Sequence, residues 1–180
     1  MRKCPKVKIT ASSANPYLKV INNDIYSKNG KVLYSVASTK TKYKVRKSVK
    51  EIEDGAFYKN DSIKSIYLPD SVKEIGEEAF GDMENLQSIR FSRSISELDY
   101  AMFNKCKKLK TVKLPKRIQT ICGNFGGKKN CYLKKIYINA VNLKKSNLKS
   151  LPKKCKVYVK SKNVKNQVKK AGFKGKVIIR

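Results

Sequence analysis

The sequence predicts an α/β solenoid, a right-handed coil with a stacked parallel sheet on one face and short helical or irregular returns on the other. The first observation is an internal period of about 23 residues, in copies at 49–71, 72–94, 95–117 and 118–140. The second is a run at the end of each copy in which alternate residues are apolar, as in a strand buried on one side. A turn of this size cannot bury its own apolar face, so successive turns must stack.

The closing run of each copy predicts one strand of the parallel sheet. In the first copy, Ile66 and Leu68 should point into the coil and Tyr67 outwards, because neighbours in a strand alternate between its two faces. The same pattern extends the stack upstream and downstream of the four clear copies. We therefore expect seven short strands, centred on Lys8, Lys44, Tyr67, Arg90, Lys113, Tyr137 and Tyr158.

The returns between the strands carry a phenylalanine at a fixed place in every copy. In the second copy, the stretch 77–86 has apolar residues at three- and four-residue spacings, which suits a short helical return. The phenylalanine should fill the wide end of the turn and lie in register with its counterparts. These are Phe57, Phe80, Phe103 and Phe125.

The two ends of the array differ. Upstream, residues 4–9 align with the strand run of the third copy, which predicts a chain that begins in mid-turn without a capping element. Because a bare apolar end promotes aggregation, we expect this sequence to be the C-terminal part of a longer array. Downstream, Ser161 is suited to cap a short helix and Gly172 to end it before a final strand at 177–179. The predicted division is a solenoid at 1–160, with a hairpin insertion at about 15–40, and a C-terminal strand–helix–strand cap completed by 161–180.

The repeat resembles the BspA-type leucine-rich repeat of bacterial cell-surface proteins, which reads roughly as I..I...AF..C..L..I.LP. Val72, Ile75, Ala79-Phe80 and Leu86 follow this pattern in the second copy. The resemblance covers residues 49 to about 140, and the stretch 15–30 is similar to the hairpin inserted in the same proteins. The fourth copy departs from the pattern by an inserted Gly126-Gly127. The resemblance implies a leucine-rich-repeat fold and an extracellular or cell-surface binding role.

The five cysteines predict neither a metal site nor a disulfide framework, because they form no CxxC pair and their number is odd. We interpret them as buried free thiols. Cys106 occupies the cysteine position of the repeat, where Asn60, Met83 and Asn130 stand in other copies. A small side chain that satisfies backbone groups inside the turn accounts for this column better than thiol chemistry does.

The charge of the chain is strongly positive and unevenly distributed. Lys and Arg number 43 against 13 Asp and Glu, which gives a formal net charge of +30, while 40% of the residues are apolar and can build a core. Every acidic residue lies between Asp24 and Asp99, whereas 100–180 carries about 25 basic residues and no acidic one. An anionic partner is one interpretation. The other is a lysine-biased genome that decorates a solvated surface.

The sequence argues against an enzyme. It contains no histidine, which is the most common general base, and no phosphate-binding loop. Carboxylate pairs such as Glu77-Glu78 fall on turns outside the sheet, where a solvated surface is the simpler interpretation. We expect no catalytic residues, no metal site and no cofactor. The N-terminal residues lack the apolar run of a secretory signal, and no stretch is apolar over the length of a membrane span.

Three classes of function remain after this exclusion. The first is an extracellular binding or adhesion module that recognises a protein or an anionic polysaccharide on a host or bacterial surface. The second is a structural spacer within a longer surface protein. The third and least favoured is a nucleic-acid-binding protein, because the excess of Lys over Arg and the lack of a known reading motif speak against it. We expect a monomer that does not insert into a membrane.

The outward side chains of the predicted strands are the candidate binding residues. None is acidic, and cations about 5 Å apart on a rigid sheet raise the local potential, while tyrosine rings offer flat apolar area and a hydroxyl group. The alternative interpretation is that long polar side chains simply cover any exposed sheet. The candidate set is Lys8, Lys44, Tyr67, Arg90, Lys113, Lys135, Tyr137 and Tyr158.

Overall fold

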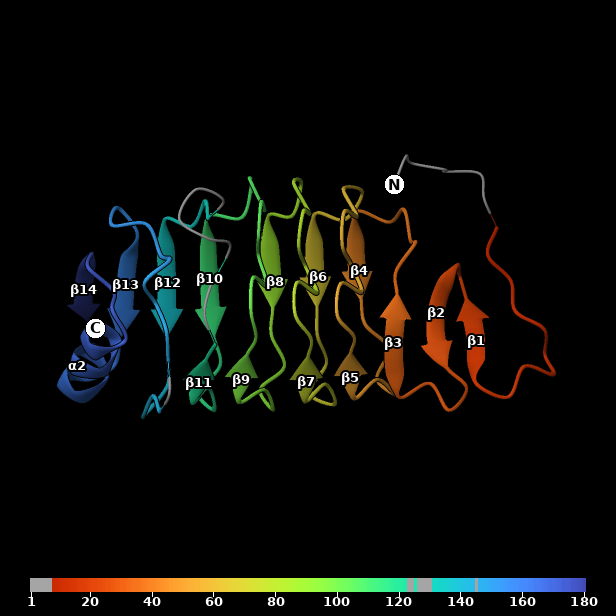
Figure 1. Ribbon diagram of the computed structural model, residues 1–180, viewed down its shortest axis with the longest axis horizontal. Helices are drawn as coiled ribbons and strands as arrows, with labels where there is room; N and C mark the ends of the chain where they lie inside the picture. Colours follow the sequence, from red (N-terminus) through yellow and green to blue (C-terminus); the bar gives the residue numbers. More distant parts are fainter. Residues whose placement is uncertain (1–7, 123–124, 126–130, 145) are drawn as a thin grey trace.

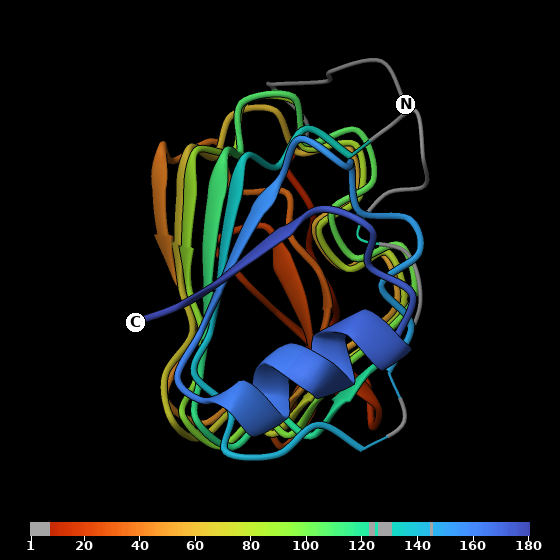
Figure 2. The same cartoon turned by 90° about the vertical axis from the view of Figure 1, so that its left-hand side faces the viewer.

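The structure, a computed structural model, describes residues 8–122, 125, 131–144 and 146–180, and it confirms the repeat solenoid. Figure 1 shows the turns stacked in one row along the long axis of the molecule, and Figure 2 looks along this axis from the C-terminal end. Strands provide most of the regular structure in the described part of the chain, where a single α-helix, α2 (Lys162–Lys170), lies near the C-terminus.

The largest row of parallel strands is here named the main sheet. It consists of β4 (Lys42–Lys44), β6 (Ser65–Tyr67), β8 (Ser88–Arg90), β10 (Thr111–Leu114), β12 (Lys135–Ile138), β13 (Lys156–Val159) and β14 (Lys176–Ile179). The strands pair in two groups, β4-β6-β8 and β10-β12-β13-β14, and Figure 1 shows both groups in one continuous row. Six of the seven expected strands are thus confirmed, and only the one centred on Lys8 is absent.

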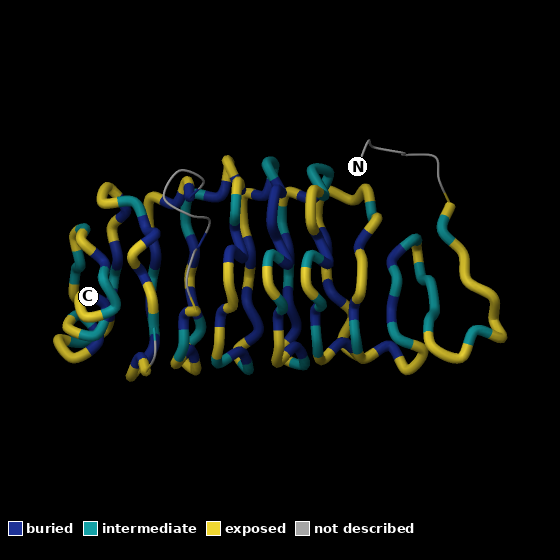
Figure 3. The backbone as a smooth tube through the Cα atoms, in the orientation of Figure 1, coloured by how far each residue is buried: buried dark blue, intermediate teal, exposed yellow. Residues whose placement is uncertain are grey.

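The register of the main sheet follows the period of the sequence. Ile66 lies opposite Ile89, and Tyr67 lies opposite Arg90, 23 positions further along the chain. Each turn therefore places equivalent residues beside one another, so the inward column is apolar and buried while the outward column is polar (Figure 3).

A second, narrower row of two-residue strands opens each return. Its members are β5 (Glu51–Ile52), β7 (Glu74–Ile75), β9 (Glu97–Leu98) and β11 (Thr120–Ile121). β5 pairs in parallel with β7, and β9 pairs in parallel with β11, and the row places Ile52 and Ile75 in the core. Together with the main sheet they enclose the core on two sides, as the end-on view shows (Figure 2).

The expected helical return at 77–86 is wrong, because this stretch consists of turns. Glu78 and Asp82 have positive φ angles of 48° and 55°, which an α-helix cannot contain. The amides also find partners in neighbouring turns, as when the Phe57 N–H donates to the Ala79 carbonyl at 2.9 Å. A helix would satisfy its backbone internally, whereas here the stacked turns satisfy one another.

The phenylalanine column fills the centre of the solenoid, as the sequence predicts. The ring centroids of Phe57 and Phe80 are 5.3 Å apart, those of Phe80 and Phe103 are 5.8 Å apart, and those of Phe103 and Phe125 are 6.3 Å apart. All four side chains are buried, and Tyr43 continues the column towards the N-terminal end by an edge contact with Phe57. The column joins the successive turns into one core.

Aspartate side chains link the first copy, 49–71, to the second, 72–94. The Asp54 carboxylate accepts a hydrogen bond from the Glu77 N–H at 2.7 Å, and Asp61 does the same for Glu84 at 3.0 Å, both 23 positions later. These carboxylates satisfy amides at the turns, so part of the acidic content of the chain serves to join repeats.

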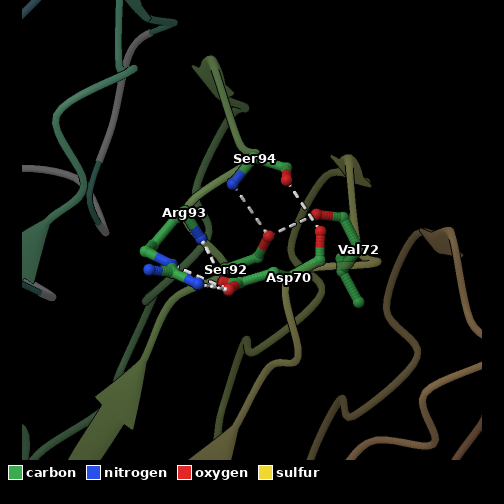
Figure 4. Close-up of polar contacts among 5 residues, drawn as sticks. All are labelled: Asp70, Val72, Ser92, Arg93 and Ser94. Carbon is green, nitrogen blue, oxygen red and sulfur yellow. Dashed lines mark hydrogen bonds and ion pairs between the residues drawn. The ribbon is translucent and has the colours of Figure 1, made fainter.

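The most elaborate of these links joins the turns after β6 and β8 (Figure 4). The Asp70 carboxylate accepts hydrogen bonds from the backbone N–H of Arg93 at 2.9 Å and from its Nε at 2.7 Å. The Arg93 guanidinium holds the pKa of Asp70 below its usual value. Ser94 donates to the Asp70 carbonyl and Ser92 donates to the Val72 carbonyl, so this turn is fixed at four points.

The N-terminal end carries a β-meander. The strands β1 (Leu18–Ile21) and β2 (Asp24–Ser27) form an antiparallel hairpin around Asn22 and Asn23, both with positive φ. The next strand, β3 (Val32–Ser35), pairs antiparallel with β2 and parallel with β5, which joins the meander to the second row. These strands fall within the stretch 15–40 that the sequence assigned to an inserted hairpin, although the division into domains at 160 stays a prediction.

The strand expected at Lys8 is wrong for a local reason. Lys8 is exposed and outside any strand, and the Ile9 amide donates to the Asn23 side chain at 3.2 Å. This contact holds the segment at the hairpin turn, so it does not add a strand beside β4 (Figure 1). Residues 1–7, the rest of the expected strand, lie outside the described residues.

A buried carboxylate anchors the meander to the main sheet. Asp24 accepts hydrogen bonds from the Tyr43 hydroxyl at 2.6 Å and from the backbone amides of Ala37 and Ser38 at 3.0 and 3.1 Å. Burial raises the pKa of Asp24 even though these three donors oppose the shift. The cluster joins β2, β4 and the segment between β3 and β4, so it fixes where the first turn begins.

The helix α2 closes the C-terminal end in the manner that the sequence predicts. The Ser161 side chain accepts a hydrogen bond from the Val164 amide at 3.2 Å, and Val164 and Val168 are buried. Gly172 ends the helix with a φ of 89°, where its N–H donates to the Lys169 carbonyl and the Phe173 N–H donates to the Val168 carbonyl. This is the pattern of a Schellman cap, and β14 follows it.

Replacing Phe80 by alanine should lower the free energy of unfolding by about 3 to 5 kcal/mol, because the ring is buried between two others and its loss leaves a cavity in the column. Chemical denaturation followed by circular dichroism measures this loss. Tyr17→Ala is the matched control, since Tyr17 is 77% exposed and should change the value by less than about 0.5 kcal/mol. A loss below about 1 kcal/mol for Phe80→Ala would contradict the core position of the column.

Candidate functional site

The candidate site is the outward face of the main sheet, here named the sheet face. Lys44, Tyr67 and Arg90 lie opposite one another on β4, β6 and β8. Further along, Lys113, Tyr137 and Tyr158 lie opposite one another on β10, β12 and β13. The alternation of strand residues explains these columns, since each outward side chain lies between buried neighbours. The structure thus brings together seven of the eight candidates, with Lys135 beside this line and Lys8 apart from it.

Near the N-terminal end, the sheet face holds one tyrosine between two cations. The Lys44 Nζ lies 5.3 Å from the centroid of the Tyr67 ring, and the Arg90 Cζ lies 4.8 Å from the same centroid. Both cations come from strands that flank β6, so they lie within range of a favourable cation–π contact. Tyr67 is only partly exposed as a result.

Near the C-terminal end, two tyrosines stack on each other. The rings of Tyr137 and Tyr158 are 4.7 Å apart between centroids and inclined by 16°. Lys113 and Arg180 also approach the Tyr137 ring, with the Arg180 Cζ 4.3 Å from its centroid. The guanidinium of Arg180 donates to the Asn139 side chain at 3.2 Å, which holds it across β13 and over β12.

This packing changes what the tyrosines can contribute. The sequence suggested rings that offer flat apolar area, but neighbouring tyrosines and cations cover the faces of Tyr67 and Tyr137. Rings on adjacent strands are separated by roughly 4.8 Å, so they stack on each other before they can stack on a ligand. What remains accessible is mainly ring edge and hydroxyl.

A second outward column lies two residues before the first and contains three lysines. Lys135 is opposite Lys156, and Lys156 is opposite Lys176, on β12, β13 and β14. All three side chains are exposed, and we name them the lysine row. The equivalent positions towards the N-terminal end are Lys42, Ser65, Ser88 and Thr111.

Sequence reasoning found only one member of this row. Lys156 precedes the strand residue Val157 just as Lys135 precedes Ile136, so a strict reading of the repeat could have assigned it. Lys176 could not be aligned because it follows α2 rather than a complete repeat. Arg180 reaches the site across a neighbouring strand, and no pattern in the sequence indicates that contact.

The charge of the sheet face is not neutralised within the chain. No acidic residue follows Asp99, so strands β10 to β14 carry none. Among the described residues, the ion pairs are Arg93–Asp70, Lys105–Asp82 and Lys107–Glu84, and none of them involves the sheet face.

The acidic side chains gather on the second row of strands instead. Glu51 and Glu74 lie opposite each other on β5 and β7, and Glu97 occupies the same place on β9. Burial raises the pKa of Glu51, and the neighbouring Glu53 and Glu74 raise it further. These three glutamates therefore lie on a row of strands separate from the sheet face.

The sheet face is shallow, without an enclosed pocket among its described residues. One open depression of about 390 Å³ lies over β4, β6 and β8, and another of about 410 Å³ lies where β8 meets β10. Substrate sites in enzymes bury most of a small ligand, which an open depression cannot do. This shape suits contact with an extended partner.

Thiol and metal chemistry are not supported by the described residues. The Cys106 Sγ donates to the Phe80 carbonyl at 3.0 Å, and burial raises the pKa of this thiol to about 12. Cys131 and Cys155 are also buried, but Cys122 is exposed, which corrects the expectation that the thiols are buried. In the part of the chain that the structure describes, no group of three or more His, Cys, Asp or Glu side chains is placed to hold a metal ion.

The Asn60 side chain supports the structural interpretation of the Cys106 column. Its amide donates to the carbonyls of Val36 and Ser38 at 3.1 and 3.0 Å, so it bonds to the preceding turn as Cys106 does two copies later. Met83, the other described member of the column, is fully buried. Asn130 lies outside the described residues.

Residues 18–157 match the model of the BspA type leucine-rich repeat region in six copies. The chain belongs to this family. The match extends the array that the sequence showed most clearly, at 49–140, in both directions. The comparison with curated proteins finds no significant match.

Solved bacterial structures share the fold. The pneumococcal vaccine antigen PcpA aligns with a TM-score of 0.70 and 22% identity, over 94% of this chain and 49% of that one. A leucine-rich cell surface protein from Faecalibacterium prausnitzii aligns with a TM-score of 0.61 and 25% identity, over 91% of this chain and 39% of that one. A leucine-rich repeat protein from Bacteroides capillosus aligns with a TM-score of 0.60 and 18% identity, over 68% of this chain and 98% of that one.

The chain thus spans about half or less of the first two of these proteins. Within the described residues, no helix has both the length and the apolar character needed to cross a bilayer.

The environments of the cysteines predict a clear order of reactivity. At pH 8 a thiol with a pKa near 12 is ionised on the order of one part in ten thousand, and Cys106 is also sheltered from reagent. Cys122 should therefore react with a maleimide well before Cys106 and Cys155 in the native protein. Peptide mass spectrometry of timed samples measures the order. In denaturant the rates should converge, and Cys106 reacting equally fast in both conditions would place it at the surface.

Proposed function

We propose that the chain is a non-enzymatic binding or adhesion module of a bacterial surface or secreted protein. It presents the sheet face to a protein or to an anionic glycan. The observation that carries the proposal is the in-register column of cations and tyrosines on the main sheet, which contains no acidic side chain. A surface of this kind is preorganised, so an extended partner binds it without ordering the protein first.

Two further findings support this role. The shallow shape of the sheet face fits a broad contact better than a small substrate. One solved relative is described as a cell surface protein and another as a vaccine antigen, which agrees with an extracellular location. The proposal includes this location, together with the absence of a cofactor.

A structural spacer is the second candidate. The elongated stack of turns would separate the parts of a longer protein that flank it (Figure 1). A spacer does not require one sign of charge on the sheet face, however, and the row of lysines without an acidic neighbour on its strands favours recognition. Nucleic-acid binding is weaker still, since stacking of bases needs free aromatic faces, and the Tyr67 and Tyr137 rings are covered by their neighbours.

The sheet face can be tested with a sulfated polysaccharide, heparin, as the probe. Binding of the folded chain should weaken by about tenfold or more between about 50 and 200 mM salt, because association releases counterions. Replacing Arg90, Lys113 and Lys135 by glutamate should abolish binding, since all three lie on the sheet face. Biolayer interferometry against immobilised heparin measures both effects.

The matched control places the same charge change on α2. Lys162, Lys165 and Lys169 lie on the helix, away from the sheet face, and their replacement by glutamate should only weaken binding. Equal losses from the two triple variants would show that binding follows net charge, and the sheet face would then not be a site.

A further inference from the structure

We infer that the sheet face binds a linear anionic polysaccharide through the lysine row, Lys135, Lys156 and Lys176, by charge rather than by stacking on aromatic rings. The inference rests on the proposed function and narrows it to one end of the sheet and one chemical class of ligand. It draws on the register of three strands, on the distribution of acidic residues and on the packing of the tyrosines.

The three lysines of the row are evenly spaced across the sheet. The three lysines occupy equivalent positions on neighbouring strands, so their Cα atoms follow one another at the strand separation of roughly 4.8 Å. A ligand that contacts all three must lie across the strands, along the axis of the solenoid. An extended molecule with negative groups repeated along its length can meet each lysine with a separate group.

The positive charge of the lysine row is not balanced by an ion pair among the described residues. Three exposed lysines in register repel one another, and cross-strand pairs of like charge are unfavourable. Lys113 and Arg180 add positive charge beside them, and no acidic residue lies on β10 to β14. Among the described residues, none of the ion pairs engages the row. A bound polyanion would remove this repulsion, so part of its affinity comes from relief of strain within the free protein.

Two tyrosines lie beside the lysine row on β12 and β13. Tyr137 and Tyr158 stack on each other at 4.7 Å, and Arg180 lies against the Tyr137 ring. Neither face of Tyr137 is free for a sugar ring or a nucleobase, and Tyr158 has one face covered by Tyr137, but both hydroxyls lie on the same side of the sheet as the lysines. They are placed to donate hydrogen bonds to sulfate, phosphate or carboxylate oxygens. Recognition therefore depends on the acidic groups of the polymer.

The other end of the sheet face lacks this arrangement. The equivalent positions on β6, β8 and β10 are Ser65, Ser88 and Thr111, so Lys42 has no cationic neighbour in its column. Lys44 and Arg90 are engaged with the Tyr67 ring. This end offers the same number of cations with a different spacing, which makes it a matched control.

The experiment compares two triple variants of the whole chain on immobilised heparin. One replaces Lys135, Lys156 and Lys176 by glutamine, and the other replaces Lys42, Lys44 and Arg90 by glutamine. The first should weaken binding by about tenfold or more, and the second by a clearly smaller factor, because Lys44 and Arg90 belong to the sheet face but not to the row. The dependence of log K on log salt should become shallower by about two to three for the first variant and by less for the second.

A third variant, Tyr158→Leu, removes one stacked ring and should cost less than about threefold in affinity. A loss as large as that of the lysine-row variant would overturn recognition by charge. Circular dichroism and denaturation of each variant establish that the fold is retained.

The outcomes separate this inference from the proposed function. If both sheet-face triples weaken binding equally and more than the α2 triple does, the sheet face is the site but the lysine row is not. If replacement of Lys162, Lys165 and Lys169 on α2 by glutamine weakens binding as much as either, both proposals fail.

A single-stranded oligothymidylate of matched charge tests the class of ligand. Tighter binding of the oligonucleotide than of heparin, lost in the lysine-row variant, would assign the row to nucleic acid and overturn the polysaccharide inference. Weaker binding of the oligonucleotide is expected, because neither face of Tyr137 is free to stack on its bases.

Discussion

The burial of one turn by the next is the constraint on which this structure depends. Each repeat is too small to enclose a core, and the phenylalanine column from Phe57 to Phe125 shows how the shortage is met, with every ring covered by its counterpart in a neighbouring turn. Backbone amides follow the same rule, since the returns donate to adjacent turns rather than along a helix. The stability and the shape of the molecule thus have one origin, the contact of each residue with the equivalent residue of the neighbouring repeat.

The same constraint organises the surface. A register that advances by whole repeats places like positions side by side, so a preference at one position of the repeat becomes a column on the molecule. A lysine at the first position of the strand forms the lysine row. A glutamate at the first position of the two-residue strand that follows forms a line of acidic residues on the second row. The fold thus converts a bias at one position of the repeat into a column of like charge on the surface.

The extent of prediction from the sequence follows from the same logic. Outward residues such as Tyr67 and Arg90 were predictable because strand alternation and the repeat period together fix their direction. The spacing of apolar residues at 77–86 fits a helix as well as it fits turns. What decides between them is the hydrogen bonding of backbone amides to neighbouring turns, and this leaves no periodic pattern in the sequence. Lys8 was misplaced because residues 4–9 resemble the strand run of the third copy. In the structure, the Ile9 amide instead donates to the Asn23 side chain in the hairpin turn. The covering of ring faces depends on side-chain packing across strands, which a repeat pattern does not encode.

The equal offset of the links between turns makes the length of this rod adjustable in fixed steps. The Lys73 N–H donates to the Lys50 carbonyl between the first and second copies, and the Gln119 N–H donates to the Ser96 carbonyl between the third and fourth, both across 23 positions, so these two joints are built alike. Loss or duplication of one complete copy would shorten or lengthen the rod by a single strand spacing of roughly 4.8 Å and leave the remaining columns aligned. Insertion of part of a copy would rotate the outward residues of that turn into the core. A gene that encodes such an array is free to vary its reach by unequal recombination, whereas the face that it displays stays the same.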